Sequence, residues 1–186
     1  AAKTDTNILL LGESGVGKTS LITCAIYGAF VDTKPTTSAE NFVYKVVEGD
    51  KTVLVNIWDT AGQEKYRSLI PMFYKGADMV ALCFSKDLMD SLEEVKTYWT
   101  SQVRSRIGTD VKIIYILTKN DLKASDDVKK AAESFCDDIG EKFITTSAAT
   151  GEGIDLFTKW IDDTSLEIVS ANTNMNSGGI AINKNT

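Results

Sequence analysis

The 186 residues are 43% hydrophobic and 25% charged, which describes one ordinary folded domain with enough length for a full core. The net charge of −6 argues against a protein that binds nucleic acids or anionic membrane surfaces. The absence of histidine excludes mechanisms that need an imidazole base. Three scattered cysteines indicate buried thiols, and no segment is long and apolar enough to span a membrane.

The first predicted element is a buried strand, residues 7–11, which leads into the pattern G-x-x-x-x-G-K-[ST] at residues 12–19. Backbone N–H groups around the glycines form a concave anion site, and the N-terminus of the next helix adds partial positive charge. In this pattern the lysine reaches the β- and γ-phosphates, and the threonine hydroxyl ligates Mg²⁺. A glycine-rich turn alone would not explain the Gly-Lys-Thr ending. The loop predicts a nucleotide site with Mg²⁺ formed by Ser14, Gly15, Val16, Gly17, Lys18, Thr19 and Ser20.

The remaining chain alternates predicted strands with predicted helices. After a polar loop, two β-rich runs at 42–47 and 53–58 flank a Gly-Asp turn and predict a hairpin. Apolar runs and helical spacing predict strands at 79–84, 112–117 and 142–144 and helices at 91–99, 125–138 and 154–168. The order predicts an α/β fold: a three-layer α/β/α sandwich of the P-loop NTPase kind, whose mostly parallel six-stranded sheet has one antiparallel edge strand.

The end of the chain has a different composition. Residues 171–186 contain five Asn, two Gly and one charged residue. Such a segment buries too little apolar surface to fold by itself, so we expect an Asn-rich disordered tail after a domain over residues 1–170.

A second loop follows the predicted strand at 53–58 and begins with Asp59. Ligands of a parallel sheet bind at the carboxyl ends of its strands, so this loop is expected to face the first one. Asp59 can hold the Mg²⁺ that Thr19 also contacts. Gly62 offers a backbone N–H to a γ-phosphate, and Gln63 can orient a water for in-line attack. Asp-x-x-Gly alone is often a simple turn. With the first loop, it predicts a catalytic group of Gln63, Lys18 and Gly62.

Two later strand ends predict guanine binding. The strand at 112–117 is followed by Thr118, Lys119 and Asp121, and an Asp carboxylate can accept two hydrogen bonds from the N1–H and N2–H₂ edge of guanine. Adenine lacks these donors, so such a site discriminates strongly. The aliphatic stem of Lys119 can lie along the base. After the short strand at 142–144, backbone contacts to the base carbonyl are expected from Ser147, Ala148 and Ala149.

In this order, the motifs resemble those of small GTPases of the Ras superfamily over residues 6–170. The sequences at 12–21, 57–64 and 72–77 resemble the Rab branch, whereas those at 40–42, 83–85 and 118–121 are closer to Rho proteins. The resemblance implies a molecular switch that binds GTP or GDP with Mg²⁺ and hydrolyses GTP slowly. A Rab-like switch would act in vesicle trafficking, and a Rho-like switch in cytoskeletal signalling.

The resemblance also assigns roles to individual residues. Phe30 would stack edge-on against the base, and Thr37 would bind Mg²⁺ and the γ-phosphate, which completes a metal set of Thr19, Thr37 and Asp59. Residues 30–47 and 59–76 would contain the two switches, ordered by the γ-phosphate, through which effector, GAP and GEF proteins bind.

Some positions depart from the family pattern. Thr118 replaces the usual Asn, Lys34 stands where an aromatic residue closes over the phosphates, and residues 38–41 replace the Rab effector sequence. No cysteine follows Cys136, so the family's lipid attachment has no acceptor here and membrane association stays open. The implied location is the cytoplasm, or the cytosolic face of membranes as a peripheral protein.

Two other functions remain as alternatives. An ATP-using P-loop enzyme is less consistent with the sequence, because Lys119 and Asp121 suit guanine. A module that holds nucleotide and scarcely hydrolyses it is consistent with Thr118 and the altered first switch.

Overall fold

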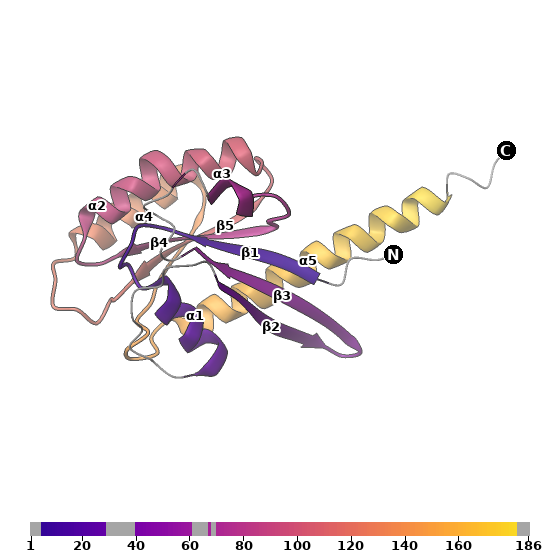
Figure 1. The fold of residues 1–186 in the computed structure, drawn as a ribbon, viewed down its shortest axis with the longest axis horizontal. Coiled ribbons are helices and arrows are strands. Elements are labelled where there is room, and N and C mark those ends of the chain that lie inside the picture. The colour runs from indigo at the N-terminus through magenta and orange to yellow at the C-terminus, as the bar shows by residue number, and fades with distance from the viewer. Residues whose placement is uncertain (1–4, 29–39, 61–66, 68–69, 182–186) are drawn as a thin grey trace.

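A computed structural model describes residues 5–28, 40–60, 67 and 70–181, and these form a three-layer arrangement around one sheet (Figure 1). The sheet has six strands in the order β2-β3-β1-β4-β5-β6. Their bounds are β1 (Asp5–Leu11), β2 (Glu40–Glu48), β3 (Lys51–Asp59), β4 (Met79–Ser85), β5 (Lys112–Thr118) and β6 (Lys142–Thr145). Strand β2 pairs antiparallel with β3, and the other neighbours pair parallel. The predicted fold class is confirmed.

Alternating residues of the central strands build a core on each face of the sheet. Ile8 and Leu10 of β1 contribute to one core, and Leu9 and Leu11 to the other. The first core is completed by α1 (Lys18–Tyr27) and α5 (Ile154–Ala181). The second lies under α2 (Met89–Glu94), α3 (Thr100–Arg106) and α4 (Asp127–Ile139). Helices therefore cover both faces, as the continuous apolar runs of β4 and β5 predict.

The helix predicted at 91–99 is longer and contains an irregular stretch. Between α2 and α3 lies η3 (Val95–Trp99), a π-helical stretch in which the Thr100 N–H donates to the Val95 carbonyl. The Thr100 hydroxyl donates to the same carbonyl at 2.7 Å. A π-helical stretch changes which side chains face the sheet, and Trp99 is fully buried here. After β3, a short 3₁₀ helix, η2 (Ile70–Phe73), leads to β4.

The last helix differs from the sequence expectation. Helix α5 continues through residues 171–181, which belong to the segment expected to be a disordered tail. This stretch contains no proline, and extending a nucleated helix adds one hydrogen bond for each residue that is fixed. The helical backbone therefore runs on past Val169, which packs against the core. The predicted domain boundary near residue 170 stays a prediction.

The cysteine prediction is confirmed, because Cys24, Cys83 and Cys136 are free and buried. Among the described residues, no helix has the length and apolar character needed to cross a membrane.

Two glycines before α5 allow a matched test of packing at the end of β6. Gly151 and Gly153 both have positive φ, 84° and 73°, but only Gly153 is crowded: a Cβ there would lie 2.0 Å from the Thr145 carbonyl oxygen. We expect Gly151→Ala to lower the free energy of unfolding by ~1–2 kcal/mol, and Gly153→Ala by a further ~1–3 kcal/mol. Urea denaturation measures both. Equal losses would contradict the close approach of α5 to β6.

Candidate nucleotide-binding site

The parallel strands bring the predicted site residues to one edge of the sheet. Leu10 of β1 lies opposite Asp59 of β3, and Thr118 of β5 lies opposite Ser85 of β4. The loops that follow β1, β3, β5 and β6 therefore leave the sheet at the same edge, where ligands of open α/β sheets bind.

The phosphate loop, residues 12–19, takes a conformation that requires glycine. Gly12, Gly15 and Gly17 have φ of 151°, 79° and 93°, and Gly17 is the N-cap of α1. A Cβ on Gly12 would lie 2.3 Å from the Cys83 carbonyl oxygen, so the start of the loop lies directly against β4. Ser14 and Gly15 are exposed, Val16 is buried in the core, and Ser20 is half-buried. The loop thus has the strand–loop–helix context that its sequence predicts.

Lys18 lies inside this loop and is only 2% exposed. Its Nζ donates to the carbonyl oxygens of Gly12 at 2.8 Å and Glu13 at 3.0 Å. A buried ammonium needs such partners, and its charge makes the loop attractive to an anion. Beneath the loop, burial raises the pKa of the Cys83 thiol to about 12, so this thiol stays neutral.

The two described metal candidates are in contact. The Thr19 hydroxyl donates to the Asp59 carboxylate at 2.5 Å, and Asp59 is fully buried. Among the described residues, no group of three or more His, Cys, Asp or Glu could hold a metal. Hard oxygen ligands suit Mg²⁺, which commonly takes one or two protein carboxylates together with phosphate oxygens. The pair fits the predicted ion.

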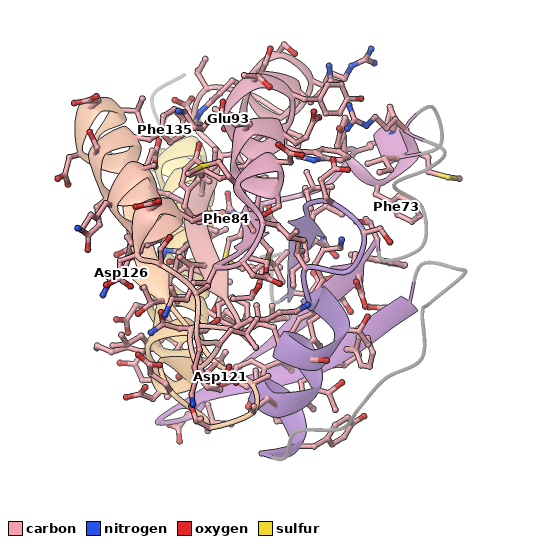
Figure 2. The ribbon with its side chains drawn as sticks, turned by 90° about the vertical axis from the view of Figure 1, so that its left-hand side faces the viewer. Phe73, Phe84, Glu93, Asp121, Asp126 and Phe135 are labelled. Carbon is pink, nitrogen blue, oxygen red and sulfur yellow. The ribbon has the colours of Figure 1, made fainter. Side chains whose placement is uncertain are left out.

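The predicted base-binding residues also come together. Asp121 lies on the loop after β5 (Figure 2), and the Ser147 hydroxyl donates to its Oδ1 at 2.7 Å. Ala148 accepts a weak hydrogen bond from Cys24 Sγ at 3.7 Å, and Ala149 is exposed. Lys119 has φ of 58°, unusual for a residue with a side chain.

Lys119 and Thr118 join this base-binding part to the phosphate loop. Lys119 Nζ donates to the Gly15 carbonyl at 2.7 Å. The Thr118 hydroxyl lies 2.5 Å from the Val16 carbonyl oxygen and 3.1 Å from that of Phe84. Although it carries only one hydrogen, this hydroxyl connects β5 with both the phosphate loop and β4. Thr118, where the family pattern has Asn, therefore holds this strand end to the phosphate loop.

Other predicted site residues fall outside the described residues: Phe30, Lys34, Thr37, Gly62 and Gln63. Their roles stay predictions.

Sequence reasoning missed one cluster beside the phosphate loop. The Glu13 carboxylate accepts hydrogen bonds from Arg67 at 2.9 Å and from the Trp99 indole at 3.2 Å. Trp99 is fully buried, as a large apolar residue of a predicted helix would be, but the sequence carries no sign of its polar partner. A carboxylate inside a phosphate-binding loop was the one available signal.

Thr118 can be tested with two conservative changes. Thr118→Val leaves buried carbonyls without their donor, which we expect to cost ~1–3 kcal/mol of folding stability and to speed release of bound GDP about tenfold. Thr118→Ser keeps the hydroxyl and is the control. Thermal denaturation and displacement of a fluorescent GDP analogue measure these effects. Wild-type behaviour of Thr118→Val would contradict the bridging role.

Comparison with known proteins gives the same family. The model of the Ras family matches residues 7–165. Ras-related protein Rab-5B of Plasmodium falciparum is 32% identical over 83% of this chain and 74% of its own length. Ras-related protein Rab-21 of Mus musculus is 35% identical over 80% and 67%, and RABD2b of Arabidopsis thaliana is 31% identical over 80% and 74%. The phosphate loop and the Asp121 carboxylate lie at one edge of the sheet. Together with these matches, they show that the chain is a small GTPase of the Ras superfamily and belongs to its Rab branch.

Proposed function

We propose that this GTPase is a molecular switch that binds GTP and GDP with Mg²⁺ and hydrolyses GTP slowly, in the service of vesicle trafficking. The observation that carries the proposal is the connection of two half-sites at one sheet edge. Lys119 and Thr118 link the base-binding part to Gly15 and Val16 of the phosphate loop. One ligand that carries both a base and phosphates would fill the whole arrangement, and membership of the Rab branch supports trafficking as its setting.

The phosphate half of the site would act by electrostatics. Backbone N–H groups of the loop and the Lys18 ammonium would hold the phosphates, and Thr19, Thr37 and Asp59 would hold the metal ion. When bound, Mg²⁺ neutralises negative charge on the β- and γ-phosphates. Gln63 would hold the attacking water, and the Gly62 N–H would contact the γ-phosphate. Positioning and charge stabilisation account for most of the catalysis of phosphoryl transfer, so these residues suffice for a slow reaction.

The environment of Arg67 supports slow intrinsic hydrolysis. Its Nη2 lies 2.9 Å from Glu13 and 2.7 Å from Glu94, so this arginine of the second switch is already paired with carboxylates. An arginine supplied by a GAP would then add the missing charge, worth roughly 10³–10⁵-fold in rate.

The base half of the site would select guanine. Ser147, itself fully buried, orients the Asp121 carboxylate through a 2.7 Å hydrogen bond. Such a carboxylate presents two acceptors to the N1–H and N2–H₂ donors, whereas adenine would leave it unpaired.

Exposed apolar side chains in β2 and η2 support docking of protein partners through residues 30–47 and 59–76. Val43 and Met72 are 55% and 71% exposed, and Trp58 contacts Phe73 with ring centroids 6.0 Å apart. Exposed apolar side chains around aromatic residues are typical of interaction surfaces. We propose that effector, GAP and GEF proteins bind here. We also propose that this chain is cytoplasmic and reaches membranes as a peripheral protein.

The role of Gln63 is testable by single-turnover hydrolysis of bound GTP. Gln63→Leu removes both the acceptor and the donor that would hold the water, so we expect the rate to fall by about tenfold or more while nucleotide affinity stays unchanged. Gln102→Leu, the same change on α3, is the control. Unchanged turnover in Gln63→Leu would refute the role, and no turnover in the wild type would favour the module that only holds nucleotide.

Guanine selection is tested by competition of GDP against ADP. The wild type should prefer GDP by about 10³-fold or more, and Asp121→Ala should lose most of this preference. Asp110→Ala, at an exposed site, should keep it. Equal affinity of the wild type for the two nucleotides would overturn the proposed function.

A further inference from the structure

The Glu13 carboxylate connects three separate parts of the chain. Its Oε1 accepts from Arg67 Nη2 at 2.9 Å and from Trp99 Nε1 at 3.2 Å. Glu13 belongs to the phosphate loop, Arg67 to the second switch, and Trp99 to the helical stretch between α2 and α3. One side chain thus joins the loop that would hold the phosphates to the segment that contains Gln63.

Arg67, which belongs to the second switch, is held in a fixed orientation. The same Nη2 donates to Glu94 at 2.7 Å, and the guanidinium carbon lies 4.0 Å from the centroid of the Tyr98 ring. An arginine that stacks on an aromatic face while its edge donates to two carboxylates has little rotational freedom left. Its side chain is about one-third exposed, so the contact is only partly screened by solvent.

Trp99 holds the carboxylate from the core side. The indole is fully buried, and a buried indole N–H needs an acceptor, which Glu13 supplies. Because the ring is fixed by packing, the position of its N–H also fixes the position of the carboxylate.

The backbone of Glu13 transmits this position to Lys18. Lys18 Nζ donates to the Glu13 carbonyl at 3.0 Å and to that of Gly12 at 2.8 Å. Anchoring of the Glu13 side chain therefore restrains the carbonyl that orients the ammonium. Positioning groups of this kind matter because small displacements of catalytic groups reduce rates strongly.

We infer that Glu13 is a positioning residue for GTP hydrolysis: held by Trp99 and Arg67, it orients Lys18 and couples the second switch to the phosphate loop. The inference rests on the proposed contact of Lys18 with the phosphates. In this arrangement the state of the second switch is communicated to Lys18 through Arg67 and Glu13, in addition to any contact through the nucleotide.

A double-mutant cycle on the full chain tests this coupling, with single-turnover GTP hydrolysis as the readout. Glu13→Ala and Arg67→Ala should each slow hydrolysis by about threefold to tenfold, and the double variant should be no slower than the slower single variant. Glu13→Gln keeps an acceptor for Trp99 and should recover part of the rate. Glu93→Gln, an exposed carboxylate of α2, should leave the rate unchanged and is the matched control.

Trp99→Phe keeps the aromatic packing but removes the N–H donor, so it should slow hydrolysis to the same extent. If Glu13→Ala fails to fold, Trp99→Phe and Arg67→Ala provide the test instead. A lowered melting temperature with unchanged hydrolysis, or independent multiplicative effects of Glu13→Ala and Arg67→Ala, would show a merely structural cluster and overturn the inference.

Lys18→Ala separates this inference from the proposed function. If the wild type neither binds nor hydrolyses GTP, the proposed function itself fails. If Lys18→Ala binds and hydrolyses GTP like the wild type, the role of Lys18 on which the inference rests fails. If Lys18→Ala loses GTP binding while the Glu13, Arg67 and Trp99 variants hydrolyse GTP normally, only the inference on Glu13 fails.

Discussion

The site depends on the register of β1 between its two parallel neighbours. Leu10 pairs with Asp59 of β3, and Leu11 pairs with Leu82 of β4. A slip of two residues would keep the buried faces but move Asp59 about 6–7 Å along the strand, beyond the reach of Thr19. The apolar side chains that alternate between the two cores therefore determine more than the stability of the fold. They determine which polar residues meet at the carboxyl edge.

A second constraint is the burial of opposite charges at this edge. Lys18 is 2% exposed and is held by carbonyl oxygens of its own loop, and Asp59 is fully buried and accepts a hydrogen bond from the Thr19 hydroxyl. Buried charges persist only when hydrogen bonds and opposite charges compensate their loss of water. Hydrogen bonds from protein groups therefore hold both charged side chains in defined positions at the site. Preorganisation of this kind is also what catalysis by charge stabilisation requires.

Much of the fold and of the nucleotide site could be predicted from the sequence because the signals are local. The runs at 79–84 and 112–117 are apolar on both faces, and the phosphate loop carries its own glycines, lysine and threonine. Less local features could not be predicted. The contacts of Glu13 with Arg67 and Trp99 span 54 and 86 positions and use residue types that usually indicate a solvated surface or a core. The continuation of α5 through residues 171–181 could not be predicted either, because the Asn-rich composition of this stretch indicates a disordered tail.

As a molecular switch, the protein is expected to change its two switch segments with the γ-phosphate while the rest of the sheet stays as it is. Hydrogen exchange measured by mass spectrometry, with bound GDP and with a nonhydrolysable GTP analogue, tests it directly. We expect slower exchange in residues 30–47 and 59–76 with the analogue, and equal exchange in β5 in both states. The same exchange in both switch segments with either nucleotide would contradict a switch and leave a protein that only holds its ligand.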